Sequence, residues 1–244
     1  MRFCIFLSFV YLYNLMINAI LFDVDNTLLD FMKYKKETAK AAAREMIRKG
    51  FPATEKEIYD RIFGVYNTKG IEYQKTFYDV VRPYNLEVHT AEKFQHIGII
   101  AYMRKKFEVL KPYPKVKETL AKLRKKGLKL GIVSDAPRNK VWDRLIMAGL
   151  EDEFDVVVSV SDTLNFKPHP SSFKLALKKL KVSPSNVLFV GDSPERDIRG
   201  AKKLGMKTCF ARYGGAKHIE DKADYEIKRF DELLRIIESE NSNH

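Results

Sequence analysis

Two kinds of hydrophobic pattern alternate along this chain. Short runs that are apolar at every position, such as residues 19–22, are typical of parallel strands buried on both faces. Longer segments in which apolar residues recur every three or four positions are typical of amphipathic helices. From residue 112 the two patterns follow one another to the end of the chain. The strands predicted from the sequence are residues 19–22, 128–133, 154–160, 187–190 and 207–211. The helices predicted between and after them are residues 116–126, 138–148, 171–180, 197–204 and 231–238.

Only helical patterns fill the interval between the first strand and residue 110. Residues 33–49 are rich in Ala, Lys and Glu and end at a glycine, and residues 54–57 read as a capping box that opens a second helix. Two more helices are predicted over residues 71–81 and from near residue 90. Apolar residues at helical spacing predict the core of a small bundle, made of Ile58, Ile62, Phe63, Tyr66, Phe94, Ile97, Ala101 and Phe107.

Together these patterns predict an α/β fold with a doubly wound, mostly parallel sheet that is interrupted after its first strand by a helical insert. Residues 16–30 and 111–244 would form the α/β core, and residues 31–110 the helical domain. Residues 1–15 are an apolar N-terminal extension.

The N-terminal apolar run is long enough to suggest a membrane span, because residues 3–22 carry no charge. If residues 19–22 belong to the sheet, the apolar residues left before them fall short of the roughly 20 needed to cross a bilayer. No small-residue cleavage site separates the run from the strand, so a signal peptide is also disfavoured. We expect no membrane span, a cytoplasmic protein, and a natural start of the domain at Met16, with residues 1–15 an upstream extension.

The composition, 45% hydrophobic and 31% charged, is that of a soluble globular protein. An excess of 44 Lys and Arg over 32 Asp and Glu gives a net charge of +12. The lysines recur on helix faces without an arginine and aromatic ladder, so we read them as solvated surface and expect no nucleic-acid partner. Two cysteines and five scattered histidines predict neither disulfides nor a zinc centre. Abundant Lys and Glu with few Gln favour a heat-adapted, thermophile protein.

Candidate chemistry begins where the first strand ends, at Asp23 and Asp25. Two carboxylates one residue apart at the carboxyl end of a buried strand lie where open α/β sheets bind their ligands. Crowding two acids in a small volume is costly unless a cation lies between them. Carboxylate oxygens suit a hard metal, so the pair suggests Mg²⁺.

Further polar residues follow other predicted strands and would reach the same edge of the sheet. Ser134 and the amides after it could hold an anionic oxygen, although serine at a strand end is commonly a turn former. Lys167 lies in a loop stiffened by prolines that could direct its ammonium inward. Asp192 ends a buried strand, and Asp197 lies in the first turn of a helix, where it could simply complement the helix dipole.

In chain order these residues form the series Asp-x-Asp-x-Thr, Ser, Lys and Gly-Asp-x-x-x-x-Asp. This series resembles the haloacid dehalogenase superfamily of phosphohydrolases from about residue 16 to residue 215. The position of the helical insert resembles the first cap type of subfamily I, on a Rossmann-like core. Among members of the superfamily, the chain is most similar to archaeal glyceraldehyde 3-phosphate phosphatases.

The resemblance implies a role for each residue. Asp23 matches the nucleophile that forms an aspartyl-phosphate, and Asp25 matches the general acid and base. Thr27, Ser134 and Lys167 match the groups that bind the substrate phosphate. The implied Mg²⁺ ligands are Asp23, Asp192 and the carbonyl of Asp25. Asp197 matches a second acid that binds the metal directly, binds it through water, or fixes the neighbouring ligands. In the dehalogenases the residue matching Asp25 is not an acid, so phosphoryl chemistry is favoured here.

The expected function is hydrolysis of a small phosphorylated metabolite, with a triose phosphate as the first candidate. A phosphomutase that uses the same phosphoenzyme, and a non-catalytic basic nucleic-acid-binding protein, remain alternatives. Substrate choice would depend on the helical cap, where Tyr34, Lys69, Tyr73 and Arg104 are equally plausible as packing or surface residues. The protein would act as a monomer or homodimer.

Overall fold

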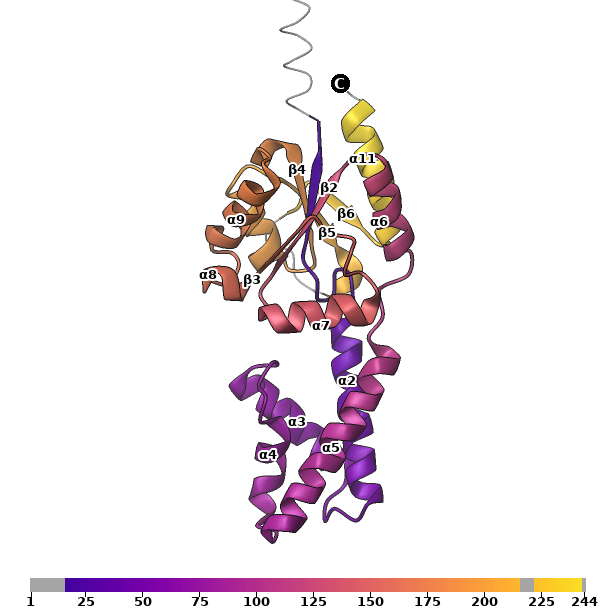
Figure 1. The fold of residues 1–244 in the computed structure, drawn as a ribbon, viewed down its shortest axis with the longest axis vertical. Coiled ribbons are helices and arrows are strands. Elements are labelled where there is room, and N and C mark those ends of the chain that lie inside the picture. Colours follow the sequence, from indigo (N-terminus) through magenta and orange to yellow (C-terminus); the bar gives the residue numbers. More distant parts are fainter. Residues whose placement is uncertain (1–15, 216–221, 243–244) are drawn as a thin grey trace, which may run out of the picture. The chain divides into compact units, whose positions relative to one another are not determined.

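The computed structural model describes residues 16–215 and 222–242. It divides into two compact units (Figure 1). The first combines the chain up to Asp30 with Lys111 onward, and the second is Phe31–Leu110. The expectation for residues 1–15 lies outside the described residues. Within those residues, no helix is long and apolar enough to cross a membrane.

The first unit is built on a sheet of six strands in the order β3-β2-β1-β4-β5-β6, and every pair of neighbours is parallel. The predicted α/β, doubly wound sheet is therefore confirmed, and β1 lies in its middle between β2 and β4. The strands are β1 (Ala19–Phe22), β2 (Lys129–Ser134), β3 (Val156–Ser159), β4 (Val187–Gly191), β5 (Lys207–Ala211) and β6 (Tyr225–Ile227).

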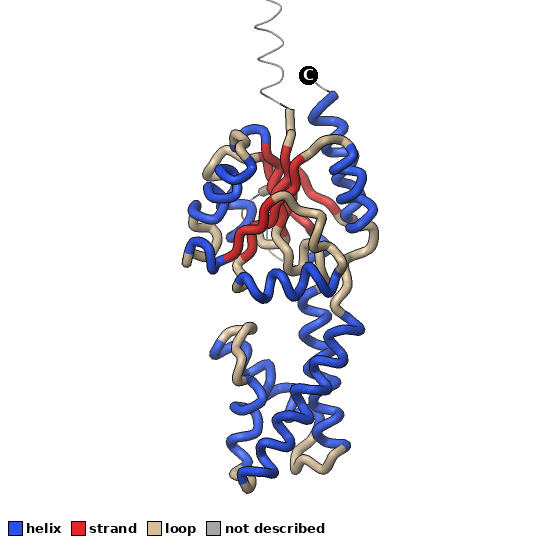
Figure 2. Tube along the Cα trace, viewed as in Figure 1, coloured by secondary structure: helices blue, strands red, loops and turns tan. Residues whose placement is uncertain are grey.

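Helices cover both faces of the sheet (Figures 1 and 2). α9 packs against β2 and β3 and touches α10, whereas α6 and α11 pack against each other on the opposite face. The helices of this unit are α6 (Val116–Lys125), α7 (Arg138–Ala148), α8 (Val160–Thr163), α9 (Pro170–Leu180), α10 (Arg199–Lys202) and α11 (Leu233–Ser242). Shorter helical turns are η2 (Pro184–Asn186), η3 (Pro194–Ile198), η4 (Arg212–Gly214) and η5 (Phe230–Glu232).

The unbroken apolar run of β1 is explained by this double covering. Ala19 and Leu21 belong to the hydrophobic cluster that includes Phe173 of α9. Phe22 points to the other face, where its ring contacts the ring of Phe230. Because side chains alternate along a strand, all four residues of β1 are buried. This strand consequently ends inside the molecule, and the next residue, Asp23, is buried as well.

The second unit is entirely helical, with α2 (Phe31–Arg48), α3 (Glu55–Lys69), α4 (Thr76–Val81), η1 (Arg82–Tyr84) and α5 (Val88–Val109). Thr54 and Glu57 form the predicted capping box at the start of α3. Ile58, Ile62 and Phe94 are buried in the bundle core as expected. Phe107, which the helical spacing also assigned to that core, is 67% exposed near the end of α5.

Several boundaries in the first unit differ from the sequence prediction, and one strand was not predicted. The strand predicted over residues 154–160 is only Val156–Ser159, because Ser159 and Asp162 form a capping box that starts α8. The helix predicted over residues 197–204 begins earlier, at Pro194, as the turn η3. The strand β6 was not predicted, because only Ile227 of its three residues is buried and no periodicity is visible.

Candidate active site

The loop after β1 turns sharply and keeps two aspartates at the carboxyl edge of the sheet. The amide of Asp23 still donates to the carbonyl of Val190 in β4, at 2.9 Å. Asn26 then adopts a left-handed conformation with φ 59°, which asparagine tolerates better than most residues. The amide of Asn26 donates to the carbonyl of Leu29 at 2.7 Å and closes the turn. Asp23 is thus fixed by the sheet, and Asp25 by the turn.

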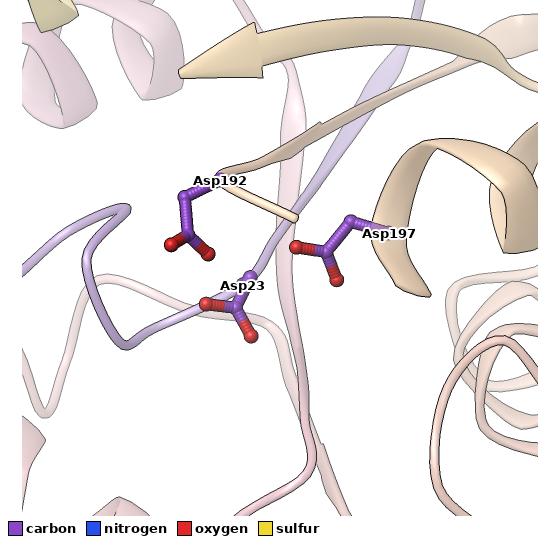
Figure 3. A group of neighbouring side chains, drawn as sticks. All are labelled: Asp23, Asp192 and Asp197. Atoms are coloured by element: carbon purple, nitrogen blue, oxygen red, sulfur yellow. The ribbon is translucent and has the colours of Figure 1, made fainter. Parts of the chain in front are cut away.

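Asp23 lies in a group of three buried aspartates. Asp192 follows β4, and Asp197 belongs to η3, so the sheet edge and the helical turn bring together residues far apart in sequence. Figure 3 shows their carboxyl groups directed toward a common space, and one oxygen of each lies within 4.8 Å of the others. The turn that carries Asp197 packs closely on β4. The contact leaves no room for a side chain at Gly191, where a Cβ would lie 2.4 Å from Asp197 Oδ2.

Lys167 supplies a buried positive charge beside this group. Its ammonium donates to Asp23 Oδ1 at 2.6 Å and to the carbonyl of Val133 at 3.0 Å. It also lies 2.7 Å from Asp197 Oδ1, as an ion pair rather than an aligned hydrogen bond. Its backbone amide donates to Asp135 Oδ1 at 2.8 Å, which holds the loop against the residue after β2. The loop therefore directs the side chain inward.

Burial and mutual repulsion shift the pKa values of this group. Burial, and then the charges of Asp23 and Asp197, raise the pKa of Asp192 to about 8. Burial also raises the pKa of Asp197, to about 6, although Lys167 opposes that rise. Burial lowers the pKa of Lys167, but attraction by Asp197 and Asp23 outweighs burial and raises it overall. Lys167 therefore stays charged, while Asp192 resists ionisation as long as no further cation is near.

The three aspartates fit a divalent cation. Three ionised carboxylates and one ammonium leave two negative charges, and carboxylate oxygens are the donors that Mg²⁺ prefers. Asp192 Oδ1 is buried and makes no hydrogen bond to any described residue. A buried carboxylate oxygen without a partner is costly, and a bound cation would remove that cost. The residues that could hold the metal are Asp23, Asp192 and Asp197.

The carboxyl group of Asp25 has a different environment from that of Asp23. Its Oδ2 lies 2.8 Å from Nη1 of Arg144, which belongs to α7. The side chain of Arg144 is 4% exposed and that of Asp25 is 24% exposed. One aspartate is thus paired with Lys167 within the acid group, and the other with an arginine from a separate helix.

Thr27 and Ser134, the other predicted phosphate contacts, are both buried at this edge. The Thr27 hydroxyl makes no hydrogen bond to any residue that the structure describes, and its carbonyl accepts from the Tyr213 hydroxyl at 2.8 Å. Ser134 ends β2, and its hydroxyl accepts from the amide of Ala136 at 3.1 Å. One hydroxyl in the turn after β1 and one at the end of β2 are therefore available at this edge to contact an anion.

The part of the chain that matches known proteins includes all of these predicted site residues. A family model described as haloacid dehalogenase-like hydrolase matches residues 20–211. The chain belongs to the haloacid dehalogenase-like hydrolase family. It is 35% identical over 232 residues to a glyceraldehyde 3-phosphate phosphatase from Pyrococcus furiosus, covering 93% of this chain and 95% of the relative. A protein of the same name from Methanopyrus kandleri is 36% identical, covering 91% of this chain and 97% of that protein.

A solved structure supports the same assignment. The crystal structure of a HAD phosphatase from Thermococcus onnurineus matches with a TM-score of 0.64 and 28% identity, covering 90% of this chain and 97% of that one. These matches place the chain among the phosphatases of the family.

Sequence reasoning named seven residues, and the structure gathers all of them at one edge of the sheet. It did not single out Arg144, or Asp135 and Arg196, whose side chains form an ion pair of 3.1 Å. One signal for Arg144 was available, because it occupies an apolar position of an amphipathic helix, between Val141 and Leu145. No local signal linked the other two residues, which are 61 positions apart.

Proposed function

We propose that this member of the family is a Mg²⁺-dependent phosphatase that hydrolyses a small phosphorylated metabolite through an aspartyl-phosphate formed on Asp23. The observation that carries the proposal is the different surroundings of the two aspartates after β1. Asp23 lies within the acid group against Lys167, whereas the carboxyl group of Asp25 meets Arg144. Separate partners allow the two carboxyl groups to take separate roles, one as nucleophile and the other as proton carrier.

In the first step, a carboxylate oxygen of Asp23 forms a bond to phosphorus while the bond between phosphorus and the substrate oxygen breaks. Asp25 gives its proton to the departing oxygen, which leaves as an alcohol. In the second step, Asp25 takes a proton from water as the water oxygen bonds to phosphorus and the bond between phosphorus and the Asp23 carboxylate oxygen breaks. Inorganic phosphate then leaves, and Asp23 is restored.

Other residues of the site would hold the phosphoryl group during both steps. The ammonium of Lys167 offsets the negative charge that would otherwise repel the Asp23 carboxylate from phosphate. The hydroxyls of Thr27 and Ser134 would donate to phosphoryl oxygens. Mg²⁺, held by Asp23, Asp192, Asp197 and the carbonyl of Asp25, would supply further charge neutralisation for the phosphate.

The helical unit Phe31–Leu110 would serve as a cap that excludes water during phosphoryl transfer and sets the choice of substrate. Glyceraldehyde 3-phosphate is the first candidate, because the relatives that match most of the chain carry that name. We expect the enzyme to act in the cytoplasm as a monomer or homodimer, without a membrane or nucleic-acid partner.

The test is phosphate release from a panel of triose, sugar and short-chain acid phosphates, measured as kcat/KM with Mg²⁺ and again with excess chelator. We expect one class of small phosphate ester to be preferred, and chelation to abolish turnover until Mg²⁺ is restored. Asp23→Asn should abolish release, whereas Asp152→Asn, the same change at an exposed position, should not alter it.

Two results would contradict the proposal. Unchanged turnover in Asp23→Asn would exclude the aspartyl-phosphate. A phosphoenzyme that passes its phosphate to a sugar phosphate faster than to water would instead identify a phosphomutase.

A further inference from the structure

One face of α7 carries an arginine where its other buried residues are apolar. Val141, Leu145 and Ala148 are buried together with Arg144, at the spacing of a single helix face. Burying a guanidinium is costly unless it is paired and hydrogen-bonded. An arginine at this position therefore requires a partner that compensates for the burial of its charge.

The partner of Arg144 lies on a different part of the sheet edge. α7 follows β2, whereas Asp25 follows β1, and the two side chains meet at 2.8 Å between Nη1 and Oδ2. The side chain of Asp25 keeps 24% exposure, so it contacts the guanidinium without being enclosed by it. The ion pair thus links the turn after β1 to the helix after β2.

The negative charge of the three neighbouring aspartates indicates a role for the ion pair between Arg144 and Asp25. Asp23, Asp192 and Asp197 already place three acids within 4.8 Å. A fourth carboxyl group directed into that group would add repulsion or compete for its cation. A fixed positive charge on α7 gives the Asp25 side chain a favourable partner outside the acid group.

We propose that Arg144 is a positioning residue that holds the carboxyl group of Asp25 away from the acid group and in place for the departing alcohol. This inference rests on the proposed phosphatase function. Arg144 itself contacts no reacting atom in this scheme. Its loss should therefore impair proton delivery to the leaving group and leave the attack by Asp23 unaffected.

Substrates with different leaving groups separate these two effects. Dinitrophenolate departs without a proton, whereas the alkoxide of a metabolite phosphate needs one. The parameter to compare is kcat/KM, because it reports the steps up to loss of the alcohol. The enzymes are the wild type, Arg144→Met and Asp25→Asn, and the matched control is Arg138→Met, which removes an exposed arginine from the same helix.

In Arg144→Met, we expect kcat/KM to fall by about 10²-fold for the best alkyl phosphate of the panel and by less than about 3-fold for 2,4-dinitrophenyl phosphate. Arg144→Lys should recover part of the alkyl phosphate activity. Adding Arg144→Met to Asp25→Asn should cause no further loss, because the residue acts through Asp25. Arg138→Met should leave kcat/KM unchanged for both substrates.

An equal fall for both substrates would mean a merely structural role and would overturn the inference, as would a further loss in the double variant. If Arg144→Met does not fold, Arg144→Gln serves in its place, and an unchanged ratio of the two kcat/KM values would then overturn the inference. Failure of the proposed function is recognised separately. In that case the wild type releases no phosphate, or Asp25→Asn shows no preference between the two substrates.

Discussion

Lys167 and Asp23 are 144 positions apart in sequence, yet the ammonium of one lies 2.6 Å from the carboxylate of the other. Their side chains are 1% and 10% exposed. The buried ammonium of Lys167 offsets the repulsion between Asp23 and Asp197. It therefore allows these two acids to lie close together before any metal ion is bound.

Replacing Lys167 tests the importance of that charge. Lys167→Met should destabilise the metal-free protein by about 3 kcal/mol, because it leaves buried carboxylates without their cation. Urea unfolding in chelator measures this loss, and saturating Mg²⁺ should reduce it. Lys174→Met, on the exposed side of α9, is the control. Equal stability of the two variants would show that the buried ammonium contributes nothing.

The raised pKa of Asp192 predicts a pH dependence of the metal-free protein. A carboxyl group with a folded-state pKa of about 8 keeps its proton where the unfolded chain, with an ordinary value of 3.8, has released it. The contribution of Asp192 to stability is thus largest at acidic pH and is lost as pH rises from about 4 through about 8. Asp197, with a pKa of about 6, contributes in the same direction.

The measurement is the melting temperature in chelator across this pH range. With rising pH it should fall more, or rise less, in the wild type than in Asp192→Asn. Because Mg²⁺ must displace the proton of Asp192, its affinity should increase up to about pH 8. A wild-type melting temperature that rises with pH over this range, to the same extent as in Asp192→Asn, would contradict the assignment.

Gly214 is predicted to admit no side chain. A Cβ at this position would lie 2.4 Å from the Cβ of Asp192 and 2.5 Å from the carbonyl of Asn26. Gly214→Ala should therefore displace both loops, cost about 1–3 kcal/mol and weaken Mg²⁺ binding, measured by calorimetry. Gly64→Ala, in the open middle of α3, should instead be neutral or stabilising. Wild-type Mg²⁺ affinity in Gly214→Ala would refute the close packing.

Tyr213 is predicted to anchor the turn after β1 through its hydroxyl. Tyr213→Phe removes the hydrogen bond to the Thr27 carbonyl and should cost about 1 kcal/mol of unfolding free energy. If the anchor also positions Thr27, KM for the phosphate ester should rise. Tyr78→Phe, at a side chain that is 48% exposed, is the comparison. No difference in stability between the two variants would count against the anchor.

The sequence by itself determined the central architecture and the acid residues. Residues 19–22 are apolar throughout, as expected of a strand covered on both faces, and the structure buries all of them. The aspartates at 23 and 192 follow buried strands, so parallel pairing was enough to predict that they share one edge. Patterns within a few residues were sufficient for these conclusions because secondary structure and strand burial leave a local periodicity.

Only the tertiary structure decided which partners these residues meet. Arg144 reaches Asp25 from another helix, and Tyr213 reaches Thr27 across 186 positions. Neither contact leaves a periodic signal, because each depends on how separate elements pack rather than on the neighbours of either residue. The same holds for the charged partners of the two aspartates after β1. Their spacing predicted a shared cation, but separate positive partners, Lys167 and Arg144, give them different surroundings.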